Sequence, residues 1–404
     1  MSIRDFGGSL SQMHVLDIIA GARPNFMKVA AVFAVADRFS DLSIRLVHTG
    51  QHYGEAMSDV FFHELGLPAP VCHLGVGSGS HATQTARIME RYGSWIENHR
   101  PEMCIVVGDV NSTLACSLVA AKEHIPVAHI EAGLRSFDRM MPEELNRVLT
   151  DAIADLLFVT EESGIQNLMA EGRAVESIHM VGHVMIDTLL RMLPRARALE
   201  VHYRRFGFQP QSYAYVTLHR PSNVDDFTRL AEICRQLDWV GEQMPVVFSV
   251  HPRTRPRLGL VSSDPQFFSS IKLVEPLSYL DSLCMVANAK LVITDSGGLQ
   301  EETSVLNVPC LTLRDSSERP VTITHGTNTV IGGDWQLFRD RVTEIRSNAR
   351  SDHECRPIPL WDGHAAERIL AICGHALESR TLRSSTVTGA LGAPIRSGGT
   401  VPVV

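Results

Sequence analysis

The sequence predicts an α/β protein composed of two doubly wound domains that face each other across a central cleft. Short, β-branched apolar runs alternate with longer amphipathic runs, a pattern typical of parallel sheets that carry helices on both faces. The alternation begins again after a charged segment at 189–211 that contains no strand-like run. A length of 404 residues also suits two or three domains of about 100–200 residues each.

Five apolar runs predict the strands of an N-terminal domain at 13–190. They lie at 13–20, 42–50, 103–109, 125–133 and 156–160. Five more predict the strands of a C-terminal domain at 191–364, and they lie at 213–219, 245–251, 271–276, 291–295 and 309–313. A helix at 365–380 follows and is expected to pack across the domains. Residues 1–12 and 381–404 are expected to form disordered tails.

Composition excludes several classes of function. The formal net charge is −8, so no basic field is available to attract nucleic acid or an acidic membrane surface. No apolar stretch approaches the ~18 residues that span a membrane, and the N-terminus lacks the apolar core of a signal peptide. The eight cysteines form no C-x-x-C pair, which favours reduced core thiols. We therefore expect a cytoplasmic protein with no nucleic-acid or membrane partner and, because no His/Cys/Asp set has zinc spacing, no bound metal.

Basic residues surround the turn after the first strand. Ligands of doubly wound sheets bind beyond the carboxyl ends of the strands, so this is a place to look for a site. Gly21 permits a tight turn, and Pro24 suits the first helical position. Arg23 and Lys28 would complete an anion site at this helix start. A solvated arginine and lysine explain the same pattern equally well.

A second anion site is predicted after the run at 291–295. Ser296, Gly297 and Gly298 open a helix, and the two glycines would let a phosphate approach free backbone N–H groups. Glu302 could accept hydrogen bonds from ribose hydroxyls. The alternative is a capping segment with Ser296 as the N-cap residue. We favour the ligand site, because a Gly-Gly helix start has little structural benefit of its own.

Three carboxylates follow strands of the N-terminal domain. Asp109 ends a buried strand but could cap the next helix, and Glu143 follows Pro142 in a favourable first helical turn. Glu131 follows an apolar strand and precedes a glycine turn, so it has the weakest purely structural explanation. An ionised carboxylate at such a position needs either an ion-pair partner or a functional role, so Glu131 is the first catalytic candidate.

Two histidines, His219 and His251, end strands of the C-terminal domain. A lone histidine is more often structural than catalytic. Two at equivalent places in one sheet, beside Arg220 and Arg253, suggest instead a rim that faces a phosphate group.

These residues belong to an ordered set of motifs. The motifs are GARPNFMK, HTGQHY, VVGDVNSTLA, HIEAGLRSFDRMMPEELNR, VTLHRPSNV, DSGGLQEE and RDSSERPVTITHGTN. Each is moderately specific alone, whereas the ordered set is highly specific. The sequence resembles the non-hydrolysing UDP-N-acetylglucosamine 2-epimerases, which have two Rossmann-like domains in a glycosyltransferase-B-like fold.

The resemblance implies a reaction in which UDP leaves by anti elimination to give a 2-acetamidoglucal and then adds back with inversion at C2. It implies that Asp109, Glu131 and Glu143 are the acid/base carboxylates. The implied substrate contacts are His219 at the diphosphate, Arg23 and Lys28 along the substrate, Ser296, Gly297 and Gly298 at phosphate, Glu302 at the ribose, Arg319 on the nucleotide side and the backbone near Leu277 at the uracil. A homodimer without a cofactor is also implied.

The sequence departs from many relatives at four places. Tyr53 and the pair Ser80-His81 differ in regions that some relatives use for activation by substrate. Ser282 replaces an aromatic residue near the uracil, and Gly182-His183 replaces a common Gly-Asn pair.

Four alternatives stay open. They are an epimerase of a related UDP-diacetamido-uronic acid, a hydrolysing epimerase that releases N-acetylmannosamine and UDP, a glycosyltransferase of the same fold and a non-enzymatic sensor of sugar nucleotides. The trio of carboxylates argues against the last two. The proton on C2 is not α to a carbonyl, so an epimerase must break the C1–O bond, which requires a base near C2 and donors on the departing diphosphate.

Overall fold

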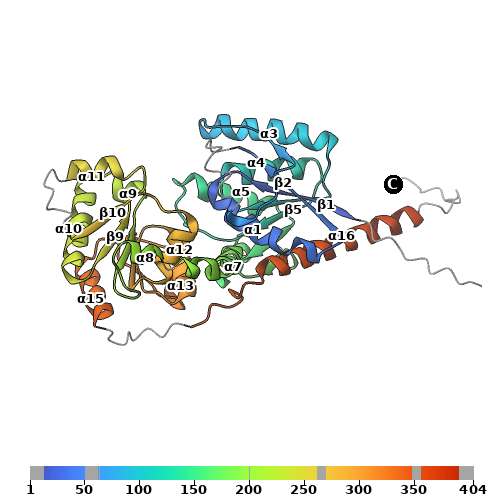
Figure 1. Cartoon of the computed structure of the whole chain (residues 1–404). Helices are drawn as coiled ribbons and strands as arrows, with labels where there is room; N and C mark the ends of the chain where they lie inside the picture. Colours follow the sequence, from blue (N-terminus) through green and yellow to red (C-terminus); the bar gives the residue numbers. More distant parts are fainter. Residues whose placement is uncertain are drawn as a thin grey trace, which may run out of the picture.

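Two parallel β-sheets, each covered by helices, form the two lobes of the computed structural model (Figure 1). The structure describes residues 13–50, 62, 64–199, 201–261, 270–347 and 356–390. The predicted α/β class with two doubly wound sheets is confirmed. No helix in these described ranges is both long and apolar enough to cross a membrane.

The N-terminal lobe contains a seven-stranded sheet in the order β3-β2-β1-β4-β5-β6-β7, with all neighbouring strands parallel. The strands are β1 (His14–Ala20), β2 (Leu42–His48), β3 (Cys72–His73), β4 (Met103–Val107), β5 (Val127–Ile130), β6 (Leu156–Val159) and β7 (Ile178–Met180). The α-helices are α1 (Arg23–Val35), α3 (His81–Asn98), α4 (Asn111–Lys122), α5 (Pro142–Ile153), α6 (Glu162–Ala170) and α7 (Val184–Ala198), and two 3-10 turns lie at Ala36–Arg38 and Val175–Ser177.

The C-terminal lobe contains a six-stranded parallel sheet in the order β10-β9-β8-β11-β12-β13. The strands are β8 (Ala214–Thr217), β9 (Val246–Ser249), β10 (Ile271–Val274), β11 (Leu291–Thr294), β12 (Cys310–Thr312) and β13 (Asn328–Val330). The helices are α8 (Val201–Arg205), α9 (Pro221–Val224), α10 (Phe227–Gln243), α11 (Arg255–Val261), α12 (Tyr279–Ala287), α13 (Gly297–Leu306), α14 (Pro320–Thr324) and α15 (Trp335–Arg346).

Every apolar run predicted to be a strand contains one, and three further strands were missed. The missed strands are β3, β7 and β13, which have two or three residues and lie at sheet edges. An edge strand is not buried on both faces, so it need not be a continuous apolar run. The residues of β7, Ile178–Met180, are accordingly only half-buried.

The order of strands reverses beside the first strand of each sheet, where β1 lies next to β4 and β8 next to β11. Ligands of open α/β sheets bind at such switch points, beyond the carboxyl ends of the strands. In this chain the turns at those ends carry Asp109, His219 and Ser296, and Lys28 lies in α1, the helix that follows β1. The topology therefore directs candidate residues of both lobes to strand ends suited to a ligand.

Helix α7 joins the two lobes, and the chain returns to the N-terminal lobe through α16 (Ala365–Ala390). Helix α7 packs against α1 of the N-terminal lobe and against α12 and α13 of the C-terminal lobe. The boundary predicted near residue 190 thus falls within a helix that contacts both lobes. The first turn of α16 is held by Asp187 of α7, which accepts hydrogen bonds from Ala365 N at 3.2 Å and Ala366 N at 2.7 Å.

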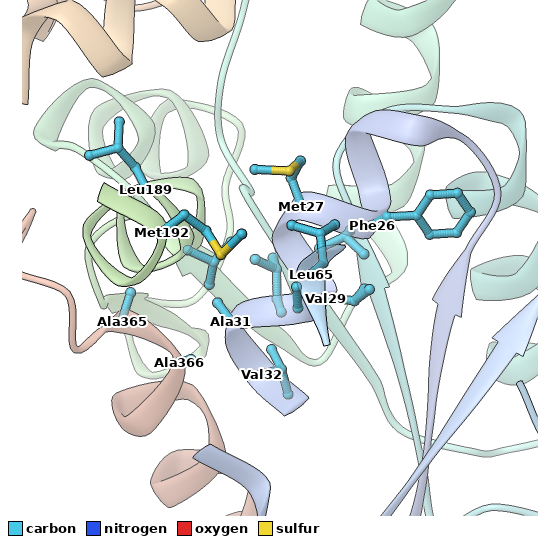
Figure 2. Close-up of a cluster of buried hydrophobic side chains, with 14 of the residues drawn as sticks. Phe26, Met27, Val29, Ala31, Val32, Leu65, Leu189, Met192, Ala365 and Ala366 are labelled. Carbon is cyan, nitrogen blue, oxygen red and sulfur yellow. The ribbon is translucent and has the colours of Figure 1, made fainter. Parts of the chain in front are cut away.

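Apolar side chains fill the space among α1, α7 and α16 (Figure 2). Met27 of α1 and Met192 of α7 lie between the first two helices, and the small side chains of Ala365 and Ala366 let α16 approach closely. Helix α16 extends ten residues past the predicted end at 380, into the segment predicted as a tail. Residues 391–404 and the predicted tail at 1–12 lie outside the described residues.

Helix α5 has its polar side buried and its apolar side exposed. Its buried residues are Glu144, Asn146, Arg147, Thr150 and Asp151. Leu145, Val148 and Leu149 on the same helix are 37–49% exposed, and Phe137 and Met140 just before it are 77% and 89% exposed. A surface helix of a monomer normally shows the opposite arrangement. We call these five residues the α5 apolar face.

Candidate active site

The turn after β5 places Glu131 in an unusual backbone conformation. Its φ is 72°, in the left-handed region that non-glycine residues seldom adopt. The backbone N–H groups of Glu131 and Ala132 both donate to Phe158 O, at 3.1 and 3.0 Å. The Glu131 side chain is only 3% exposed. Such strain persists only where the surroundings fix it, and it is common at functional sites.

Two cations from different lobes bind the Glu131 carboxylate. Lys28 of α1 pairs with Oε2, and Arg319, which precedes α14, donates from Nη2 to Oε1 at 3.0 Å. Gly108 makes room for this group, because a Cβ there would lie 2.8 Å from Lys28 Nζ and 3.3 Å from Glu131 Oε2. The structure therefore brings together three residues predicted from sequence.

These cations control the protonation of Glu131. Burial alone would raise the pKa of its carboxyl group, but the charges of Lys28 and Arg319, with a smaller contribution from His183, outweigh burial. The pKa of Glu131 is consequently held well below its ordinary value. At neutral pH the group is a buried, ionised carboxylate, the form that can accept a proton.

Glu301 and His183 complete the cluster, and sequence reasoning missed both. Arg319 pairs through Nε with Glu301 Oε1, while His183 Nε2 lies 3.0 Å from Glu301 Oε2 and 3.7 Å from Glu131 Oε1. The side chains of neighbouring helical residues point in different directions, so the carboxyl groups of Glu301 and Glu302 have different neighbours. Two features of the sequence could have indicated these residues. For Glu301 the feature is the adjacent candidate Glu302, and for His183 it is the Gly182-His183 pair that replaces a common Gly-Asn pair.

The cluster is balanced by ion pairs rather than arranged for a metal ion. Glu131, His183 and Glu301 do place possible ligand atoms within 4.8 Å of one another. However, Lys28 and Arg319 already neutralise the two carboxylates, and a divalent cation would have to displace both. This charge balance supports the expectation of no metal.

Asp109 and Glu143 differ from Glu131 in their surroundings. Asp109 follows Gly108, and its Oδ2 accepts hydrogen bonds from Arg147 of α5, whose Nε lies at 3.0 Å. Its side chain keeps 31% of its surface exposed. Glu143 lies in the first turn of α5 with an exposed side chain, and no contact among the described residues joins it to Glu131. The structure thus places Asp109 beside the cluster and leaves Glu143 apart from it.

Asp295, at the end of β11, organises the turn that carries His219. It accepts hydrogen bonds from the backbone N–H groups of His219 and Arg220, and its Oδ1 lies 3.1 Å from His219 Nδ1. Burial would raise the pKa of Asp295, but the contact with His219 and the backbone donors lower it overall. The His219 side chain is 39% exposed, and its ring centroid lies 5.5 Å from that of exposed His251. The two predicted histidines are therefore neighbours, and Nε2 of His219 is the nitrogen left for a ligand.

The start of α13 is open, as a phosphate site requires. A Cβ at Gly297 would meet no atom within 4 Å, and one at Gly298 would meet only Met185 Cε and Ser296 Oγ at 4.0 Å. Packing therefore does not require these glycines. Ser296 is the N-cap residue by position but makes no side-chain capping hydrogen bond, so the capping explanation is weak. The free N–H groups of a helix start attract anions.

Glu302, also in α13, is buried beside Tyr279. Burial and the neighbouring charge of Glu301 raise the pKa of Glu302 to about 8. At neutral pH it is therefore largely protonated and can both donate and accept hydrogen bonds. Leu277 is half-buried two residues before α12. Arg23 opens α1, but its side chain lies outside the part of the chain that the structure describes.

Two lobes with parallel sheets, a strand-end carboxylate held by cations from both lobes and an open helix start are the features expected of a sugar-nucleotide epimerase of the glycosyltransferase-B-like fold. A family model described as UDP-N-acetylglucosamine 2-epimerase matches residues 35–374. The chain belongs to this family, and its enzyme class is isomerase.

Relatives and solved structures match over most of the chain. The UDP-N-acetylglucosamine 2-epimerase of Methanocaldococcus jannaschii is 40% identical over 88% of this chain and 98% of its own length. A UDP-2,3-diacetamido-2,3-dideoxy-D-glucuronate 2-epimerase of Pseudomonas aeruginosa is also 40% identical, over 82% of this chain and 91% of the relative. The crystal structure of the M. jannaschii enzyme in complex with UDP-GlcNAc and UDP has a TM-score of 0.78 at 38% identity, covering 89% of this chain and 99% of that one.

The pKa of Glu302 gives the first prediction, which concerns stability. The pKa of Glu302 is about 8 in the folded protein, whereas its reference value is 4.5. The protonated form therefore contributes to stability in full below pH 4.5, and this contribution is lost as the pH rises through 8. The Glu302→Gln variant stays neutral at every pH. Relative to wild type, its free energy of unfolding should therefore rise between about pH 5 and pH 9 by at least ~1 kcal/mol.

Thermal melts of both proteins at the two pH values check this prediction. The exposed Glu176 provides the control, because Glu176→Gln should give the same small difference at both pH values. A Glu302→Gln difference that does not change with pH would show that Glu302 is ionised throughout.

Proposed function

We propose that this protein is a non-hydrolysing epimerase that interconverts UDP-GlcNAc and UDP-ManNAc in the cytoplasm. The observation that carries the proposal is the buried, ionised Glu131, held by Lys28 from one lobe and Arg319 from the other. A base in this state can remove a proton from carbon, and its cations also suit a diphosphate. No cofactor is required, since the substrate supplies its own leaving group.

The proposed reaction has two balanced steps. In the first, Glu131 accepts the proton from C2 while the C1–O bond breaks and its electron pair goes to UDP, giving a 2-acetamidoglucal. In the second, an acid delivers a proton to the opposite face of C2, and the diphosphate oxygen bonds again to C1. Asp109, beside the cluster, and Glu143 are the candidate acids. A positioned base or acid contributes about 10²–10⁴-fold to the rate.

Donors on the departing diphosphate supply the other large contribution. His219, the open start of α13 and Arg319 are positioned on the C-terminal lobe, where we place the nucleotide. One such donor to a developing oxyanion is worth roughly 10²–10³-fold. We place the ribose at Glu302 and the uracil at the backbone near Leu277, with Arg23 and His251 as further contacts.

A UDP-diacetamido-uronic acid is the second candidate substrate. The relative from P. aeruginosa that is named for such a sugar matches this chain at the same 40% identity as the M. jannaschii enzyme. Both substrates share the UDP group, C2 and its acetamido group, so the proposed chemistry at C2 is the same. The comparison of turnover on the two sugars identifies the substrate.

Deuterium exchange tests the reaction class. During incubation with UDP-GlcNAc in D₂O, we expect NMR spectra to show deuterium entering C2 as the manno epimer forms. Formation of free N-acetylmannosamine and UDP would instead identify a hydrolysing enzyme. Absence of exchange with both candidate UDP-sugars would contradict the proposed function.

Removal of the base should stop turnover. The Glu131→Gln variant cannot accept the C2 proton, so its kcat should fall by about 10³-fold or more, while UDP should still bind, as measured by calorimetry. Glu176→Gln is a matched control on the surface of the same lobe and should keep wild-type kcat. A Glu131→Gln variant with wild-type kcat would reject the assigned role.

We further propose that the protein is a homodimer that buries the α5 apolar face. The polar side of helix α5 is buried in the interior. There Glu144 accepts hydrogen bonds from the backbone N–H groups of Ser136 and Phe137. The helix therefore cannot turn to hide Leu145 and Leu149. A second copy of the chain would cover this face symmetrically, as in most soluble homo-oligomers.

Charge insertion tests the dimer. The double variant Val148→Glu/Leu149→Glu would bury unpaired charges in the interface, and it should elute as a monomer in size-exclusion chromatography with light scattering. Phe227→Glu replaces an apolar residue that is 54% exposed on the C-terminal lobe, and it should leave the dimer intact. A wild-type protein that is monomeric at micromolar concentration would overturn the proposal.

A further inference from the structure

His183 is completely buried at the start of α7 and is fixed on two sides. Its Nδ1 accepts a hydrogen bond from Met185 N at 3.4 Å. Its ring meets the edge of Trp361 with centroids 5.1 Å apart, and Trp361 is itself anchored because Nε1 donates to Thr160 O at 2.9 Å. The imidazole therefore has little freedom to rotate.

The segment that includes Leu360 and Trp361 packs directly against Gly182, the residue before His183. Gly182 has a φ of 87°, and a Cβ there would lie 1.9 Å from Leu360 O. Only glycine fits this close approach, so the segment carrying Trp361 is held directly against the residue before His183. The orientation of the histidine is thus set by parts of the chain that are far apart in sequence.

This orientation determines which nitrogen carries the proton. Because Nδ1 accepts from a backbone N–H, the proton of the neutral ring is on Nε2. Nε2 lies 3.0 Å from Glu301 Oε2 and 3.7 Å from Glu131 Oε1. Nε2 is therefore the edge of the ring that faces the two carboxylates, although it makes no aligned hydrogen bond to either one in the structure.

A chain of contacts runs from His183 to the proposed base. Glu301 uses its other oxygen, Oε1, for Arg319 Nε, and Arg319 uses Nη2 for Glu131. Lys28 and Arg319 pair with the two carboxylates, and the buried Glu161 adds a third carboxyl group that acts on Arg319. Among the described residues, Asp187 of the same helix is a further charged group that faces His183.

We propose that His183 is a positioning residue for the epimerase reaction: its Nε2 edge, packed 3.0 Å from Glu301 Oε2, fixes that carboxylate, Glu301 orients Arg319, and Arg319 with Lys28 holds Glu131 for proton transfer at C2. The proposal rests on the function proposed above for Glu131. Nothing in the contacts requires His183 to touch the substrate.

Two variants distinguish the polar contact of His183 Nε2 from the packing of the ring. His183→Phe keeps a ring against Trp361 but has no donor, whereas His183→Gln places an amide N–H near the position of Nε2. Because the polar Nε2 edge beside a buried carboxylate is lost, we expect His183→Phe to lower kcat about 10- to 100-fold with KM changed less than about threefold. The acid limb of its kcat–pH profile should move to higher pH, since the carboxylates lose a group that favours their ionised form. His183→Gln should recover most of the rate and the wild-type profile.

A matched control comes from the preceding strand. His179 of β7 is half-buried beside Phe158 and has no recorded contact with the cluster. His179→Phe should therefore keep the wild-type kcat and pH profile. A wild-type profile for folded His183→Phe, or a rate for folded His183→Gln as low as that of His183→Phe, would overturn the proposal.

A measurement on the wild-type enzyme covers the case in which His183→Phe does not fold. Long-range ¹⁵N–¹H NMR of histidine-labelled protein, with His183→Gln for assignment, should show the Nε2–H tautomer, and the Nδ1–H tautomer would overturn the proposal. The Glu131→Gln variant distinguishes the proposed role of His183 from the proposed function of the protein. An inactive Glu131→Gln enzyme beside a fully active His183→Phe enzyme rejects only the role of His183, whereas a fully active Glu131→Gln enzyme rejects the proposed function itself.

Discussion

The Glu131 carboxylate is buried between two lobes, and this is possible only because positive charge reaches it from both. An isolated ionised carboxylate in such a place would carry a large desolvation cost and would take up a proton instead. Lys28 comes from α1 of the N-terminal lobe and Arg319 from the turn before α14 of the C-terminal lobe. A buried carboxylate that is ionised at neutral pH thus exists here only when cations of both lobes reach it.

Backbone geometry maintains this arrangement. Glu131 adopts a left-handed φ, and Gly108 leaves the space that Lys28 and the carboxylate occupy. Both residues follow central strands of one sheet, β5 and β4, whose register is fixed along several residues. The strain at Glu131 is therefore stored in a rigid element, where the surrounding sheet can hold it.

The sequence predicted those parts of the molecule that depend on local pattern. Central strands such as β4 are buried on both faces, so they appear as continuous apolar runs, whereas the short edge strand β7 has no such requirement. Glu131 and the Gly297–Gly298 pair stood out because each lacks a good local explanation. Arg319 was found only through family resemblance, since it lies in no regular element and reaches Glu131 across 188 residues of chain.

His183 and Glu301 could not be predicted by the same reasoning, because their roles are defined by contacts across the fold. A buried histidine is ordinarily part of a core, and only the return of the chain through Trp361 shows which way this ring faces. Glu301 stands beside Glu302 in one helix, yet the two carboxyl groups have opposite protonation tendencies, with the pKa of Glu301 lowered and that of Glu302 raised to about 8.

The division of charge between Glu301 and Glu302 follows from which neighbours each one has. Glu301 faces Arg319 and His183, so it can stay ionised without unbalancing the cluster. No cation of the described residues pairs with Glu302, and burial together with its neighbour's charge keeps it largely neutral at neutral pH. If Glu302 were ionised, the start of α13 would carry an uncompensated negative charge that would repel an incoming diphosphate. A neutral carboxyl group removes this repulsion and can still hydrogen-bond a ribose hydroxyl. The same pair of adjacent glutamates can therefore support the proposed catalytic ion network on one side of the helix and the proposed anion site on the other.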